Sequence, residues 1–127
     1  MKCGKTIVFL FSLLAILSLS AGIVWAGKTS VTINAPAEVS QGSEITIQIT
    51  VTHSANSYFH YTEWVRVMVN NQELANWNYS ASQRPEAAVF TKEIKYTVNT
   101  PVEIKAEGSC NIHGSQGPAF LKVSVKD

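Results

Sequence analysis

The stretch Ser43–Thr52 reads SEITIQITVT, and its apolar residues alternate with polar ones. A side-chain period of two is typical of a β-strand that buries one face and exposes the other to water. A shorter alternation precedes this stretch at Val31 and Ile33. The sequence therefore predicts a half-buried sheet whose inner face consists of isoleucine and valine.

Five further strand-like runs follow at short spacing, over residues 63–69, 73–79, 88–98, 102–109 and 120–125. Turn-forming residues separate the runs, at Gln41-Gly42, Asn70-Asn71, Arg84-Pro85, 99–101 and 114–118. Seven short strands at this spacing predict an all-β fold, a seven-stranded antiparallel sandwich of the immunoglobulin-like type. The sequence contains no glycine-rich phosphate loop, so nothing in it supports nucleotide chemistry.

The first 26 residues have the pattern of a secretory signal peptide. Lys2 and Lys5 precede the mostly apolar run Ile7–Leu19, and Val24-Trp25-Ala26 fits a small-x-small cleavage site. We therefore expect cleavage after Ala26 and a mature domain over residues 27–127 in an exported, periplasmic compartment. The alternative is a retained membrane anchor, because about 20 mostly apolar residues are enough to span a bilayer.

Length and composition limit the domain count, the partners and the disulfides of this chain. The chain has 127 residues and a formal charge of +1, and the expected mature part keeps 101 residues with 8 basic and 9 acidic side chains. This length predicts a single domain. Nucleic-acid binding is not expected, because it requires clustered lysine and arginine. Cys3 leaves with the leader and Cys110 stays, which allows no intrachain disulfide in the mature domain.

All three histidines and the remaining cysteine lie at predicted strand ends or in loops. His53 closes the strand that starts at Ser43, His60 lies in the connection before residue 63, and Cys110 and His113 lie together where the sixth strand ends. Strand ends from distant parts of the chain can meet at one pole of a sandwich. We therefore predict that these four side chains surround one metal ion. The alternative is a buried structural cysteine beside incidental surface histidines.

The ligand types narrow the choice of metal. Imidazole with one thiolate suits iron, copper or zinc and disfavours calcium and magnesium, which prefer oxygen ligands. A blue-copper centre usually adds a weak axial methionine, whereas Met68, the one methionine of the expected mature domain, lies inside a predicted strand. Redox metals are therefore the leading candidates, and a copper electron carrier stays possible but lacks this ligand.

The segment Cys110-Asn111-Ile112-His113-Gly114 resembles the Cys-Asn-x-His-Gly motif of the superoxide reductase family, the neelaredoxin/desulfoferrodoxin iron-binding domain. Supporting similarity extends over Ala35–Val39, Trp64-Val65 and the predicted hairpin Val69–Ala75. The resemblance implies an immunoglobulin-like barrel on which four equatorial histidines and one axial cysteine hold mononuclear iron. It also implies reduction of superoxide to hydrogen peroxide at the open sixth position, with electrons from an external donor protein.

By this resemblance, Cys110 is the axial thiolate and His53, His60 and His113 are equatorial ligands. Lys28 matches the family's lysine, which attracts superoxide and helps to deliver protons, and is our candidate catalytic residue. The alternative is that Lys28 is an ordinary solvated lysine at a frayed chain terminus.

The sequence departs from the family pattern at the domain start. The family's Glu-Lys-His is replaced by Gly27-Lys28-Thr29, so one equatorial histidine is missing. His53 and His60 are also seven residues apart where the family usually has six, and Ser54 replaces a proline. The fourth equatorial position is left for water, for Thr29, or for the α-amino group of Gly27 after cleavage.

The sequence is also compatible with two other functions. One is an exported metal-binding or electron-transfer domain, with iron or copper, that lacks superoxide reductase activity. The other is a β-sandwich interaction module in which the histidines bind nothing. A membrane is expected as a partner only if the leader stays attached.

Overall fold

Residues 27–126 are described by a computed structural model, and within them the chain forms eight strands. Their bounds are β1 (Ser30–Asn34), β2 (Glu38–Ser40), β3 (Ser43–Thr52), β4 (Thr62–Val69), β5 (Gln72–Asn78), β6 (Val89–Val98), β7 (Val102–Cys110) and β8 (Ala119–Lys126). Seven of these strands are the predicted runs, so the predicted all-β sandwich is confirmed.

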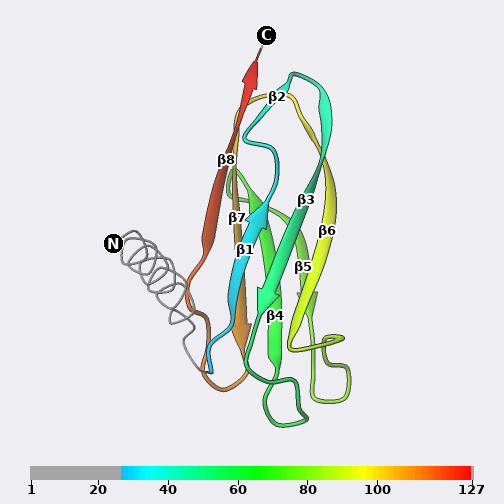
Figure 1. Ribbon diagram of the computed structural model, residues 1–127, viewed down its shortest axis with the longest axis vertical. Coiled ribbons are helices and arrows are strands. Elements are labelled where there is room, and N and C mark those ends of the chain that lie inside the picture. The colour runs from blue at the N-terminus through cyan, green and yellow to red at the C-terminus, as the bar shows by residue number, and fades with distance from the viewer. Residues whose placement is uncertain (1–26, 127) are drawn as a thin grey trace, which may run out of the picture.

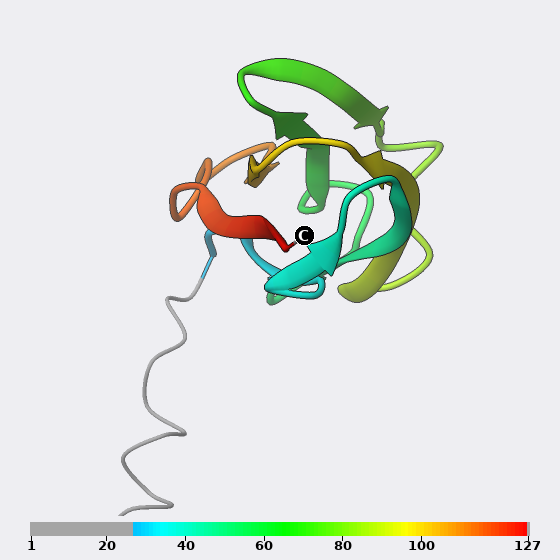
Figure 2. The same ribbon diagram turned by 90° about the horizontal axis from the view of Figure 1, so that it is seen from above.

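The strands form two layers (Figure 1). One sheet has the order β1-β3-β6, and the other has the order β2-β8-β7-β4-β5. Seen along the strands, the two sheets curve around a common interior (Figure 2). This is the sheet-on-sheet packing that alternating strands favour, because each sheet covers the apolar face of the other.

The predicted alternation of β3 is what builds the core. Ile47, Ile49 and Val51 are completely buried, and they face equally buried side chains such as Val65 in β4 and Ile104 in β7. Full burial of one such aliphatic side chain stabilises the fold by roughly 1.5–3 kcal/mol. The polar residues between them stay partly exposed, as the period of two predicts.

Strand β2 was not predicted. Its three residues pair in parallel with β8, so the otherwise antiparallel sandwich contains one parallel pair. Three residues are too few to show a period of two, and only Val39 in this strand is partly buried. Pairing with the edge of β8 therefore stabilises this strand, and its own sequence pattern does not predict it.

Four chain segments meet at one pole of the sandwich. Strands β3 and β7 end there, and β1 and β4 begin there (Figure 1). This arrangement follows from the antiparallel order of β1 with β3 and of β4 with β7. The predicted site residues lie at these strand ends or just beyond them.

The predicted signal peptide, residues 1–26, lies outside the described residues. Between residues 27 and 126, none of the secondary structure is a helix long and apolar enough to span a bilayer. Cleavage and export therefore stay predictions.

Candidate metal centre

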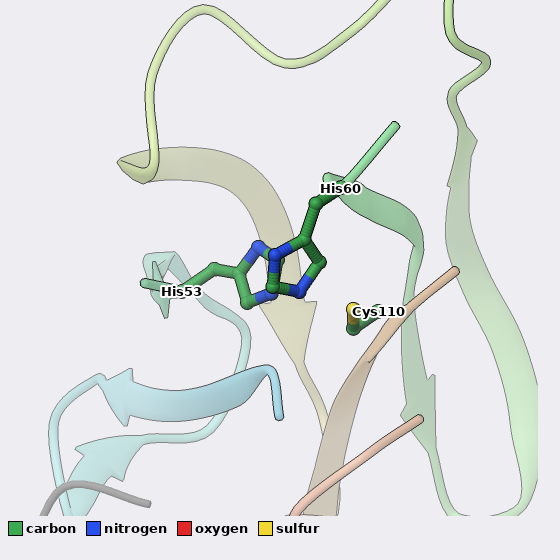
Figure 3. A group of neighbouring side chains, drawn as sticks. All are labelled: His53, His60 and Cys110. Atoms are coloured by element: carbon green, nitrogen blue, oxygen red, sulfur yellow. The ribbon is translucent and has the colours of Figure 1, made fainter. Parts of the chain in front are cut away.

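Three of the predicted ligands converge at this pole. One ligand atom each from His53, His60 and Cys110 can be chosen so that all three atoms lie within 4.8 Å of one another (Figure 3). His53 follows β3, His60 precedes β4, and Cys110 ends β7. His53 and Cys110 are 4% and 3% exposed, so the inner side of the cluster is shielded from water.

His113 completes the group from the exposed side. Its Nδ1 atom lies 3.2 Å from Nε2 of His60 and 4.0 Å from Sγ of Cys110. With metal–nitrogen bonds of about 2.1 Å, two ligands at right angles lie about 3 Å apart. His113 therefore lies within ligand-sharing distance of His60 and close to Cys110, beside the group of three.

The turn after β7 holds the cysteine and His113 in place. Cys110 and Gly114 exchange two backbone hydrogen bonds of 2.9 and 3.1 Å, and Gly114 has a φ of +79° that favours glycine. Within this turn the N–H groups of Ile112 and His113 each donate to the Cys110 sulfur across 3.4 Å. Hydrogen bonds to a ligating sulfur are one way in which proteins set the reduction potential of iron–sulfur centres.

A β-bulge lies beside the cysteine. Thr62 pairs with Cys110 but Trp64 pairs with Ser109, so Glu63 is an extra residue in β4. Bulges are frequent next to active sites because they redirect neighbouring side chains. Here the bulge lies directly after the loop that carries His60.

Asn111 fixes the His60 loop to the cysteine turn. Its side-chain nitrogen donates to the carbonyl of Phe59 at 3.1 Å, and its side-chain oxygen accepts the N–H of Tyr61 at 3.0 Å. Its own backbone N–H donates to the Tyr61 carbonyl at 3.1 Å. His60 lies between the two residues that Asn111 holds, so its position depends on this side chain.

His53 is kept in the form that can bind a metal. Burial lowers the pKa of His53 below its usual 6.5, and the neighbouring His60 and His113 lower it further, while the backbone groups of Gly27 and Ala55 act in the opposite direction. The ring is therefore neutral at pH 7, and a neutral imidazole is the ligating form.

One nitrogen of the His53 ring has no partner within the described part of the chain. Its Nε2 lies 3.3 Å from the Gly27 carbonyl oxygen, whereas its buried Nδ1 has no hydrogen bond. When Nε2–H donates to that carbonyl, the lone pair is on Nδ1. A buried unpaired acceptor beside a cysteine and two more imidazoles is chemically suited to a metal ion.

The structure decides against one candidate for the fourth equatorial position. Thr29 is completely buried, and its Oγ1 lies 3.0 Å from Oγ1 of Thr62, within hydrogen-bonding distance. Its methyl group packs on Gly108, where an added Cβ would lie only 2.9 Å away. The Thr29 hydroxyl therefore already has a partner in the protein interior.

The other two residues of this segment lie differently. Lys28 is exposed. Gly27 is buried against the histidines, because a Cβ built on it would lie 2.8 Å from Nδ1 of His113. Lys28 is thus next to a residue in contact with the site.

Sequence reasoning missed the roles of Asn111 and Thr62, and it named Gly27 only for its α-amino group, not for its contacts with His53 and His113. Asn111 stands inside the Cys-Asn-x-His-Gly motif, and that position was the signal that could have identified it. The contacts of Thr62 and Gly27 carry no comparable signal, because they join residues that are 33 and 26 positions apart in the chain.

The donor set fits one iron, copper or zinc ion. One thiolate and three imidazoles are the soft and intermediate ligands that these metals bind, and Cys110, His53 and His60 are supplied by different strand ends. The residues present therefore suit the metal that the resemblance implied.

Comparison with known proteins identifies a family whose model covers most of the chain. The family model described as desulfoferrodoxin matches residues 25–115. Among curated proteins, no sequence matches the chain.

Solved structures share the fold at low sequence identity. A superoxide reductase (neelaredoxin) from Ignicoccus hospitalis has a TM-score of 0.65 and 17% identity, over 78% of this chain and 83% of that one. The CARDB domain of a Pyrococcus furiosus protein, in complex with di-metal ions, has a TM-score of 0.61 and 18% identity, over 83% and 94%. The sulfur carrier protein SoxY from Chlorobium limicola has a TM-score of 0.54 and 10% identity, over 76% and 79%. Likeness at these identities establishes the fold alone.

Proposed function

Because the chain belongs to the desulfoferrodoxin family, we propose that it is an exported mononuclear iron protein that reduces superoxide to hydrogen peroxide. The family is iron-binding, and superoxide reductases take superoxide as substrate and require an electron donor. The single observation that carries the proposal is the convergence of three imidazoles and one thiol at one pole.

The ligand roles follow from burial and position. His53, His60 and His113 supply imidazole nitrogens. Cys110 supplies a sulfur that accepts hydrogen bonds from two backbone N–H groups. Iron bound there would supply the electron for superoxide and, paired with an anionic thiolate, favour its transfer. The exposed His113 marks the side from which solvent and substrate reach the cluster.

A positively charged side chain of the protein attracts superoxide and assists its protonation. Each superoxide takes up one electron and two protons to become hydrogen peroxide, so a positive group near the entrance assists both binding and protonation. Lys28 is exposed and adjacent to Gly27, which contacts the cluster. We assign it this role, with solvent as the final proton source and an external protein as the electron donor.

The first experiment tests the metal. The exported protein, loaded anaerobically, should bind close to one iron and show a thiolate-to-iron absorption band after oxidation. Cys110→Ser should lose this band, while the matched variant Ser109→Ala should keep it. Absence of the band from the unmodified, iron-loaded protein would contradict the thiolate–iron assignment.

The second experiment tests the reaction. Reduction yields one hydrogen peroxide for each superoxide consumed, whereas dismutation yields one for every two and releases dioxygen. With a chemical reductant present, we expect the first ratio and no dioxygen. An iron-loaded protein that consumes no superoxide would instead be a metal-binding or electron-transfer domain, a function compatible with the missing equatorial histidine at Thr29.

A further inference from the structure

We propose that the α-amino nitrogen of Gly27, freed when the leader is cleaved after Ala26, is the fourth equatorial ligand of the metal. This inference rests on the proposed iron site. It assigns a ligand to the place where the resemblance predicted a histidine and the chain has Thr29.

Gly27 touches two of the three imidazoles. Its carbonyl oxygen lies 3.3 Å from Nε2 of His53, and a Cβ built on it would lie 2.8 Å from Nδ1 and 3.0 Å from Cγ of His113. No side chain could occupy that space without displacing the His113 ring. The absence of a side chain at residue 27 is therefore what lets the backbone approach the cluster.

The nitrogen of Gly27 lies within reach of the cluster. In standard covalent geometry, a residue's nitrogen is about 2.5 Å from its Cβ position. The Gly27 nitrogen is therefore at most about 5.3 Å from Nδ1 of His113, given the 2.8 Å contact. Two nitrogen ligands that share one ion would lie at most about 4 Å apart, so a movement of about 1 Å would bring the Gly27 nitrogen within bonding reach.

Backbone hydrogen bonds fix the segment that carries Gly27. The N–H of Thr29 donates to the Gly114 carbonyl at 3.2 Å, and the Thr29 carbonyl accepts the N–H of Gln116 at 2.9 Å. Both partners belong to the loop that follows Cys110 and His113. The segment is thus tied to the same turn that carries two of the proposed ligands.

The competing protein ligand has a different partner. The Thr29 hydroxyl is buried beside Thr62 at 3.0 Å, and the Thr29 methyl packs on Gly108. A ligand role for this hydroxyl would require Thr29 to leave both contacts. The neighbouring nitrogen needs no such rearrangement of the core.

Cleavage changes the chemistry of this nitrogen. Inside the chain it is an amide whose lone pair is delocalised into the carbonyl, so it is a poor metal ligand. After cleavage at the small-x-small site it is a primary amine, which loses a proton on binding a metal. The precursor should therefore bind iron more weakly than the processed protein, which delays full metal loading until after export.

The test uses the full-length chain, produced in a host that exports and cleaves it, with iron as the probe. Intact mass should show Gly27 as the first residue. Protein made with ¹⁵N-glycine is loaded with iron and oxidised, and electron–nuclear double resonance is recorded. One strongly coupled nitrogen should change from the ¹⁴N to the ¹⁵N pattern, because histidine nitrogens are not labelled.

Two variants provide the controls. A variant with one threonine inserted between Ala26 and Gly27 turns the Gly27 nitrogen back into an amide after cleavage at the same site. It should lose the labelled coupling and bind iron at least about tenfold more weakly, the smaller end of what a lost supporting contact costs a metal site. Thr29→Val should keep the coupling, since its hydroxyl is not a ligand.

The outcomes separate this inference from the proposed function. If the exported protein starts at another residue, or lacks the ¹⁵N coupling while the thiolate band is present, the amine is not a ligand and the iron site still stands. If neither stoichiometric iron nor the thiolate band is found, the proposed function fails as well.

Discussion

The side-chain amide of Asn111 donates a hydrogen bond to the carbonyl oxygen of Phe59 across 3.1 Å. The same side chain accepts the N–H of Tyr61 at 3.0 Å. Its two ends therefore hold the residues immediately before and after His60. A loop ligand with its chain neighbours fixed loses less conformational entropy when it binds a metal.

Asn111→Ala should weaken iron binding about 10–100-fold, the range typical of residues that orient metal ligands. The two lost side-chain hydrogen bonds should also reduce the free energy of unfolding by about 1–3 kcal/mol. Competition with a chelator measures the affinity and urea unfolding measures the stability. Asn34→Ala, which removes an exposed asparagine hydrogen bond to Gln48, is the matched control and should leave iron affinity unchanged. Equal affinity in both variants would show that Asn111 does not position His60.

Lys28→Met should lower the second-order rate of superoxide consumption about tenfold at low ionic strength, because a positive charge near a site raises the rate of anion encounter. The effect should shrink as salt is added, since screening removes the attraction. Pulse radiolysis of the iron-loaded protein gives the rates. Lys122→Met is the control. Lys122 lies opposite Glu103 in the pairing of β8 with β7, at the end of β7 that is far from Cys110. A rate loss that is the same in both variants argues against a local role for Lys28.

Gly108→Ala should reduce the free energy of unfolding by about 1–3 kcal/mol, as overpacking of a tight core does. The added Cβ would lie 2.9 Å from Cγ2 of Thr29 and 3.3 Å from Cγ1 of Val31. Thr29→Ser removes that methyl group and keeps the hydroxyl near Thr62. In a double-mutant cycle the serine should recover part of the loss, which urea unfolding of the four proteins will measure. Simple additivity of the two changes would mean that the contact with Thr29 is not the source of the strain.

Tyr79 should make the fold sensitive to alkali. Burial, with a smaller contribution from Glu86, raises the pKa of Tyr79 from 10.0 to about 12, and within residues 27–126 its buried hydroxyl has no hydrogen-bond partner. The unfolded chain loses this proton near pH 10 and the folded chain retains it to about pH 12. Between these values the unfolded state binds fewer protons, so stability falls as the pH rises.

Tyr79→Phe removes the titrating group and should make the urea midpoint fall less steeply between pH 10 and pH 12. At pH 8 the variant should be at least as stable as the unmodified protein, because it no longer buries an unpaired hydroxyl. Its ring can still pack edge-on against Phe90, at a centroid distance of 5.8 Å. Parallel pH curves for the two proteins would contradict the raised pKa.

Much of the fold could be predicted from local patterns. The alternation in Ser43–Thr52 identified β3 and its inner face, and Asn70-Asn71 identified the turn between β4 and β5, where both residues have positive φ. Such patterns are readable because strand burial and turn conformation depend on neighbouring residues. Strand β2 escaped prediction, since its pairing depends on β8, more than 80 residues further along the chain.

The sequence by itself determined every strand except β2, the residue types of the site and their position at strand ends. Only the tertiary structure decided that His53, His60, Cys110 and His113 share one pole, that the Thr29 hydroxyl lies beside Thr62, and that Gly27 lies against two imidazoles. The reason is physical: periodicity records which face of a strand is buried, whereas contacts between distant residues depend on how two sheets pack and on the register between their strands.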